Sequence, residues 1–229
     1  MTARAAFACG IALALLGAGS AAGEDSDPFR DAEAQQNTDL ERLRAVNDGE
    51  LEFLTGAAEK RELHTRMQLT LRDTSLRDGW VDMQQCQSGL DGMTLTEIVY
   101  RYEEMRELRV LSSRGIDAAH VEGGSVQLRG VMPGAEICVA AMVRILRPLG
   151  EGRYRIVSGP YHRRFFDGYF PMRLSLEVAF PAQALHWQSV QPPPQPGHRI
   201  VAAPGRVTID TRFAGRLTVE LDFAETPEP

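Results

Sequence analysis

The sequence is poor in the residues from which metal sites are usually built. It contains five histidines and three cysteines, and none of them forms a close pair such as H-x-x-x-H or C-x-x-C. No stretch is rich enough in aspartate to resemble a calcium-binding loop. We therefore expect no metal site and no cofactor, and we interpret each histidine as an isolated surface or partly packed residue: His64, His120, His162, His186 and His198.

Motifs for nucleophilic catalysis and phosphate binding are also missing. No G-x-S-x-G sequence is present that could raise a serine above a sheet. The pair Gly123-Gly124 precedes a predicted strand, not a helix N-terminus that could hold a phosphate. These absences favour a non-catalytic protein. A hydrolase whose carboxylates are brought together only by folding is the less favoured alternative.

Lysine is almost absent, and basic residues are outnumbered by acidic ones. Lys60 is the single lysine, and 25 basic side chains face 31 acidic ones for a net charge of −6. Loss of Arg4 with an N-terminal signal would make the balance −7. An acidic balance disfavours nucleic acid as a partner, because binding to phosphates needs a basic surface.

Long hydrophobic runs are absent except at the N-terminus. Arg4 precedes the apolar segment Ala5 to Leu16, and Ser20-Ala21-Ala22 supplies small residues for cleavage. This arrangement predicts a secretory signal over residues 1–22. The run is shorter than the roughly 20 residues that cross a bilayer. We expect export to the periplasm or beyond, with no transmembrane segment after cleavage.

Only two cysteines, Cys86 and Cys138, follow the predicted signal. Exported proteins fold in an oxidising compartment, where paired cysteines commonly form disulfides. The sequence therefore predicts a Cys86–Cys138 disulfide, with two separate buried thiols as the alternative.

Residues 23–60 begin with an acidic leader and then acquire helical character. Leu40, Leu43 and Val46 recur at three-residue spacing, and Thr38 with Glu41 matches a capping box. The pattern predicts a short amphipathic helix before the main domain. At the other end, we expect residues 226–229 to form a disordered tail.

Residues 61–225 are dominated by alternation of apolar and polar side chains, the period of a half-buried strand. Turn signals separate these segments, and no helices alternate with them. We therefore predict an all-β domain, an antiparallel β-sandwich of immunoglobulin-like or related type. Two small sandwiches divided near Gly159 are the architectural alternative. The expected strands cover residues 63–72, 80–86, 97–102, 107–111, 125–131, 135–146, 153–157, 172–180, 185–190, 206–213 and 217–223.

One stretch of the predicted domain, residues 159–171, is unusually rich in aromatics and arginine. Asp167-Gly168 predicts a turn there. One interpretation is that its rings fill the end of the β core. The other is a binding rim, since tyrosine, tryptophan and arginine are frequent anchors at interfaces. The candidate binding residues are Tyr161, His162, Arg163, Arg164, Phe166, Tyr169 and Trp187.

Together these features predict an exported, non-catalytic β-sandwich protein that binds another protein of the cell envelope. The alternative is a carbohydrate-binding module in which Tyr161, Tyr169 and Trp187 stack on sugar rings. A signal segment, one cysteine pair and a sandwich are common to envelope accessory proteins, adhesion modules and carbohydrate-binding modules, which is a similarity of architecture and not of site.

Overall fold

The computed structural model describes residues 47–57, 62–165 and 168–226. The predicted signal segment and the predicted N-terminal helix lie outside the described residues, as do residues 227–229 of the predicted tail. Within the described ranges the protein is built almost wholly of strands, with one short helix, α2 (Ser75–Asp78). The prediction of an all-β sandwich is confirmed. In this part of the chain, no helix has the length and apolar character required to cross a membrane.

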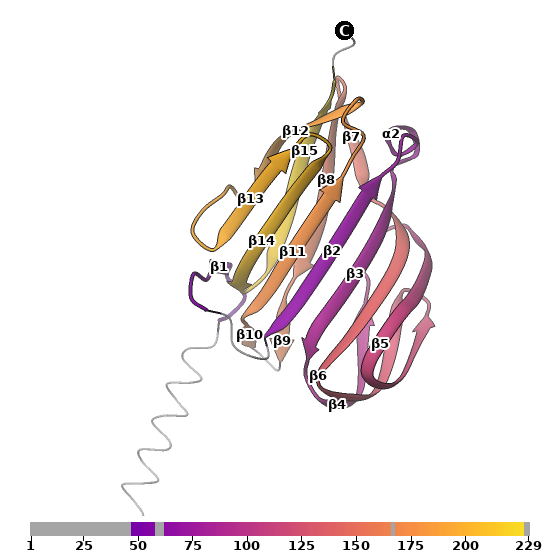
Figure 1. Ribbon diagram of the computed structural model, residues 1–229, viewed down its shortest axis with the longest axis vertical. Helices are drawn as coiled ribbons and strands as arrows, with labels where there is room; N and C mark the ends of the chain where they lie inside the picture. Colours follow the sequence, from indigo (N-terminus) through magenta and orange to yellow (C-terminus); the bar gives the residue numbers. More distant parts are fainter. Residues whose placement is uncertain (1–46, 58–61, 166–167, 227–229) are drawn as a thin grey trace, which may run out of the picture. The chain divides into compact units, whose positions relative to one another are not determined.

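A nine-stranded sheet forms the larger layer (Figure 1). Its strands are paired in the order β1-β14-β11-β2-β3-β6-β4, while β13 pairs with β14 and β5 pairs with β6. The prediction of antiparallel pairing holds for every pair except β2 and β11, which run parallel. The nine strands are β1 (Glu52–Phe53), β2 (Leu63–Leu71), β3 (Trp80–Leu90), β4 (Met93–Val99), β5 (Met105–Glu122), β6 (Ser125–Arg144), β11 (Met172–Ala179), β13 (His198–Ala203) and β14 (Arg206–Ala214).

A four-stranded antiparallel sheet forms a second layer, in the order β12-β15-β8-β7. The remaining two strands, β9 (Arg163–Phe165) and β10 (Gly168–Phe170), pair only with each other. In Figure 1 this small hairpin lies at the opposite end of the molecule from β7, β12 and β15. The strands of the second layer are β7 (Leu146–Gly150), β8 (Arg153–Tyr161), β12 (Leu185–Gln191) and β15 (Leu217–Glu225).

The core lies between the inward faces of the two sheets, because strand alternation sends every second side chain inward. On β2 the side chains of Met67, Leu69 and Leu71 are buried, and on β15 the same holds for Val219 and Leu221. One continuous hydrophobic cluster contains residues from both sheets and from both sides of Gly159. The polar residues between these positions point to the outer faces.

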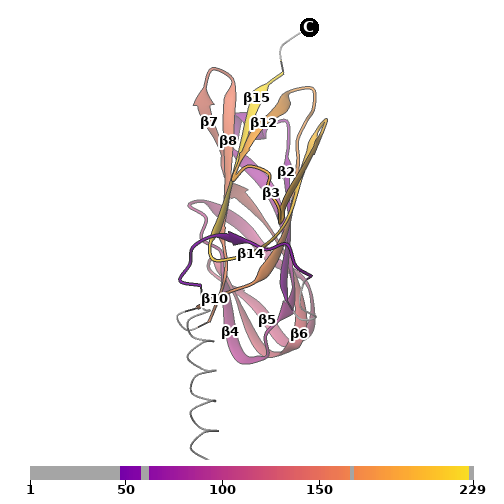
Figure 2. The same ribbon diagram turned by 90° about the vertical axis from the view of Figure 1, so that its left-hand side faces the viewer.

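Strands β5 and β6 were expected as short separate segments, but they are 18 and 20 residues long. The N–H of Tyr100 bonds to the carbonyl of Gly124 at one end of β6, and the N–H of Arg144 bonds to the carbonyl of Glu104 at the other. Tyr100 and Glu104 are four residues apart, so at most about 14 Å separates them. The two ends of β6, which bond to these residues, therefore lie close together. A strand of this length can bring its ends together only if it bends back on itself. Positive φ angles at Gly130 and Gly134 accompany the bend. Both views show β4, β5 and β6 gathered at one end (Figures 1 and 2).

Candidate functional site

The β9–β10 hairpin contains three of the seven residues expected to bind a partner, Arg163, Arg164 and Tyr169. Gly168 pairs with Phe165, Tyr169 with Arg164, and Phe170 with Arg163. Gly168 therefore belongs to β10, whereas Asp167 of the predicted Asp167-Gly168 turn lies outside the described residues. Phe166 lies outside the described residues.

Tyr169 is the centre of a cluster that we name the tyrosine–arginine cluster: His162, Arg164, Tyr169 and Arg216. The guanidinium carbons of Arg164 and Arg216 lie 5.6 and 5.8 Å from the centroid of the Tyr169 ring. The imidazole of His162 meets the same ring edge-on, with the centroids 5.8 Å apart. Cations near an aromatic ring are attracted by its quadrupole. The ring therefore holds two arginine side chains at the surface.

The backbone before β1 fixes the position of this ring. The N–H of Tyr169 donates to the carbonyl of Asn47 at 3.0 Å. Gly49 has a φ of +112°, and a Cβ atom there would lie 2.9 Å from Cε2 of Tyr169. The close approach of this glycine supports the ring from one side, while His162, Arg164 and Arg216 stay exposed.

Positive charge accumulates around the tyrosine–arginine cluster. Partial burial lowers the pKa of His162, and the charges of Arg101, Arg164 and Arg216 lower it further, against the opposing effect of the Pro160 carbonyl. Among the described residues, none of these three arginines has an acidic side chain within ion-pair distance. The cluster is therefore locally basic on a chain whose net charge is −6.

Arg163 has a different environment from its neighbour Arg164. Its guanidinium donates to both carboxylate oxygens of Asp91, at 2.8 and 3.3 Å, and its side chain is only 19% exposed. A half-buried bidentate ion pair of this kind holds its two side chains in a fixed geometry. It ties β9 to the turn before β4.

Besides Arg163, the predicted binding residues Tyr161 and Trp187 also lie outside the tyrosine–arginine cluster. Tyr161 is 9% exposed, and its hydroxyl shares a 2.5 Å hydrogen bond with Ser158; burial raises the pKa of this phenol. Leu217 pairs with Tyr161 and Val219 with Ser158, so β8 contains one extra residue here, and this bulge turns Tyr161 toward the core. The positive φ of Gly159 accompanies it.

Trp187 lies far along the second sheet from the hairpin. It pairs with Phe223 of β15, whereas Tyr161, next to the hairpin, pairs with Leu217. Six residue steps along a strand correspond to about 20 Å. The structure therefore does not bring Trp187 together with Tyr169.

A second polar surface lies on the outer face of the nine-stranded sheet, where a groove has a volume of about 570 Å³. We call it the sheet groove. Its floor follows one row of paired residues from β13 to β3 through β14, β11 and β2, strands that lie side by side in Figure 1. The row consists of Arg199, Asp210, Ser175, Arg66 and Cys86.

The sheet groove was not among the sites predicted from the sequence. The signal was the polar parity of the strands, since Arg66 and Gln68 alternate with Met67 and Leu69 on β2. The alternation predicts that Arg66 and Gln68 point outward, but it does not predict which strands are the neighbours of β2.

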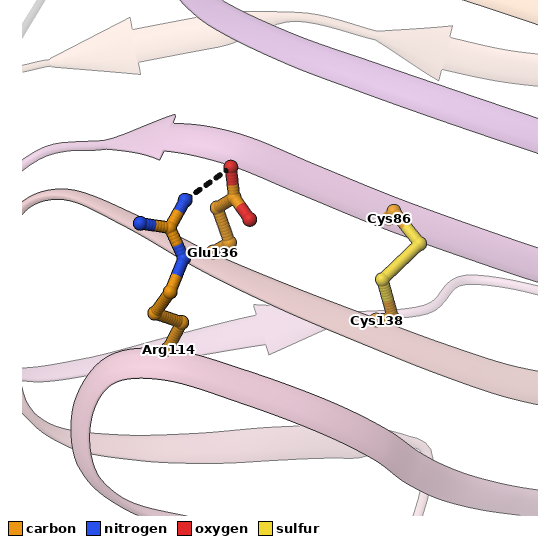
Figure 3. The surroundings of a disulfide bond; sticks show 4 residues. All are labelled: Cys86, Arg114, Glu136 and Cys138. Carbon is orange, nitrogen blue, oxygen red and sulfur yellow. Dashed lines mark ion pairs between the residues drawn. A yellow bond between two sulfur atoms is a disulfide. The ribbon is translucent and has the colours of Figure 1, made fainter.

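The disulfide predicted between Cys86 and Cys138 is present. It joins β3 to β6 at directly paired positions, and an Arg114–Glu136 ion pair of 2.9 Å lies near it (Figure 3). Both cysteines are partly exposed on the outer face of the sheet. A disulfide of this kind is typical of proteins from an oxidising compartment.

Among the residues that the structure describes, no group of three or more histidine, cysteine, aspartate or glutamate side chains is arranged to hold a metal ion. No protein-family model and no curated protein sequence matches the chain.

Distant similarity to solved structures is found with M1 zinc metallopeptidases of Deinococcus radiodurans. The unsubstituted enzyme is 14% identical with a TM-score of 0.38, and the match covers 72% of this chain and 42% of that one. A substituted form bound to a Tyr-Ser-Ala substrate is 13% identical with a TM-score of 0.38, over 72% and 43% of the two chains. This chain spans less than half the length of these enzymes. The comparisons therefore assign no family and no activity.

Proposed function

We propose that the chain is an exported, non-catalytic binding module that recognises an acidic surface of another cell-envelope protein through the tyrosine–arginine cluster. The observation that carries this proposal is the exposed pair of guanidiniums held at the Tyr169 ring, Arg164 at 5.6 Å and Arg216 at 5.8 Å. Arginine and tyrosine at such a position offer charge, hydrogen bonds and apolar area together.

The electrostatics of the cluster determine the kind of partner. Because Arg101, Arg164 and Arg216 all act on His162, a surface rich in aspartate or glutamate would gain attraction from several charges at once. Such complementarity raises the association rate and is weakened by salt. Phe170, which is 38% exposed beside Tyr169, adds apolar area at the same place.

Export is supported by two independent features. The first is the signal-like N-terminal sequence of residues 1–22. The second is the Cys86–Cys138 disulfide, since such bonds persist mainly outside the reducing cytosol.

Capture from envelope extracts, followed by elution with increasing salt, tests the proposal. We expect the wild-type protein to retain a partner that an Arg164→Ala, Tyr169→Ala double variant loses, and we expect salt to release it. An Arg129→Ala, Met132→Ala double variant is the control, because both residues are exposed on β6 and lie outside the cluster. Equal recovery by wild type and the first double variant would contradict the proposed surface.

The two other functions considered from the sequence gain no support at the residues named for them. Stacking on sugars through Tyr161, Tyr169 and Trp187 would need three exposed rings on one surface, but Tyr161 is buried and Trp187 lies apart. A hydrolase would need a carboxyl group of raised pKa as general acid. In the sheet groove, the hydrogen bond from Arg173 instead lowers the pKa of Asp210.

A further inference from the structure

Two arginines of the sheet groove, Arg66 and Arg199, form no ion pair with a described acidic residue, although the charge of Arg199 also acts on Asp210. Its two acidic side chains are each paired with an arginine beside the groove: Asp210 with Arg173, and Glu177 with Arg206 at 3.8 Å. Arg66 and Arg199 also line the groove. Neither has an ion-pair or hydrogen-bond partner among the described residues, so the groove has an excess of two positive charges available to a ligand.

Neutral hydrogen-bonding groups lie at the β2–β3 end of the sheet groove, next to Arg66 and on the side away from Arg199. Gln68 and Gln84 face each other across β2 and β3, both are exposed, and neither side-chain amide is bonded to a described residue. Each amide offers two donors and one acceptor. A sulfate ion, which only accepts hydrogen bonds, could not satisfy the amide oxygens. Hydroxyl groups both donate and accept, and they match these amides.

The dimensions of the groove suit a small extended ligand. Its volume of about 570 Å³ lies within the usual range of small-molecule sites. Arg199 and Arg66 are separated by three strand spacings, about 14 Å. Val201, which is 47% exposed at one wall, provides an apolar contact for the C–H face of a ring.

We propose that the sheet groove binds an acidic saccharide, with a carboxylate held by Arg66, hydroxyl groups bonded to Gln68 and Gln84, and a second carboxylate near Arg199. A planar guanidinium binds a carboxylate through two parallel hydrogen bonds. The groove shares no residue with the tyrosine–arginine cluster, so this inference stands independently of the proposed protein partner.

Titration calorimetry of the oxidised protein with trigalacturonic acid tests the inference. We expect saturable binding that Arg66→Gln weakens by at least about tenfold, as loss of a charge-assisted hydrogen bond predicts. The trimethyl ester of the same trisaccharide keeps the rings and removes the charges, and it should bind at least about tenfold more weakly. Arg129→Gln, an exposed arginine on β6 outside the groove, should bind trigalacturonic acid as the wild type does.

Three results would overturn the inference: no saturable binding, affinity unchanged in Arg66→Gln, or citrate competing as strongly as the trisaccharide, which would indicate a simple anion site. Thermal unfolding of each variant verifies the fold. If Arg66→Gln does not fold, Arg199→Gln and Gln84→Ala test the same groove from exposed positions on two other strands. Unchanged affinity in both would equally refute the site.

Discussion

Cys86 of β3 and Cys138 of β6 are directly opposite each other in neighbouring antiparallel strands, with their Cα atoms 4.0 Å apart, and they form a disulfide. The bond closes a chain segment with a sequence separation of 52. This segment includes β4, β5 and the bend of β6. The disulfide therefore connects this bent part of the larger sheet to β3.

Removing this bond should destabilise the protein substantially. We expect a Cys86→Ala, Cys138→Ala double variant to lose about 2–4 kcal/mol of unfolding free energy, because the open chain regains loop entropy when unfolded. Urea unfolding followed by circular dichroism measures the difference. Titration of the unfolded, unreduced wild type should find neither thiol free, and two reactive groups would contradict the bond.

The core between the sheets should be sensitive to truncation. Ile156 of β8 is 0% exposed, and Ile156→Ala should cost about 2–5 kcal/mol because it removes buried apolar contacts and leaves a cavity. Leu95→Ala is the control, since Leu95 is 69% exposed and its loss should change stability by less than about 0.5 kcal/mol. Urea unfolding of both variants checks this, and similar losses in the two would place Ile156 outside the core.

The turn between β14 and β15 requires glycine at position 215 for two reasons. Gly215 has a φ of +87°, and a Cβ atom there would lie 1.8 Å from the carbonyl oxygen of Glu50. Gly134 has a similar φ of +85°, but a Cβ atom there would have no other atom within 4 Å. Substitution of Gly134 therefore measures the free-energy cost of the positive φ alone. We expect Gly134→Ala to lose about 1–2 kcal/mol and Gly215→Ala clearly more. The melting temperatures of the two variants measure these losses. Equal losses would show that the backbone at Glu50 moves away from the new Cβ atom without a cost in stability.

Acidification should weaken the fold through His198. This side chain is 1% exposed and stacks on Phe53. Burial lowers its pKa below 6.5, against the opposing hydrogen bond to the Pro192 carbonyl. A base with a lowered folded pKa is protonated more readily when unfolded, so stability is complete above about pH 6.5 and falls as the pH drops toward the folded value.

Unfolding free energies at pH 7.5 and 5 test this effect. Both values lie above the ordinary aspartate pKa of 3.8, so the paired carboxylates contribute little to the change. His198→Gln should reduce the loss of stability between the two values, whereas His120→Gln, at an exposed position on β5, should leave it as in the wild type. An unaltered pH dependence in His198→Gln would assign the effect elsewhere.

Much of the fold could be predicted because strand formation leaves a local pattern. The alternation of Met172, Leu174 and Leu176 predicted a strand over residues 172–180, and β11 covers Met172–Ala179. The alternation along residues 217–223 likewise matches β15. The disulfide followed from the presence of only two cysteines beyond the signal.

The candidate sites were less predictable, because both depend on contacts between distant segments. Arg164 and Tyr169 lie within one hairpin and were predicted from the local richness in aromatics and arginine, but Arg216 joins them from the turn before β15. The inward turn of Tyr161 results from an extra residue in β8, opposite the step from Leu217 to Val219, and simple alternation along β8 does not predict it.

The sequence by itself determined the strands that have a clear alternation, such as β11 and β15, the buried face of each and the pairing of the two cysteines, since these follow from side-chain periodicity and composition. It did not predict β9, β10 or β13. Only the tertiary structure decided strand order. Strands pair through backbone N–H and C=O groups and not through their side chains, so the pattern of side chains does not predict which strands become neighbours. The parallel pairing of β2 with β11 places Arg66 beside Ser175. That pairing creates the sheet groove.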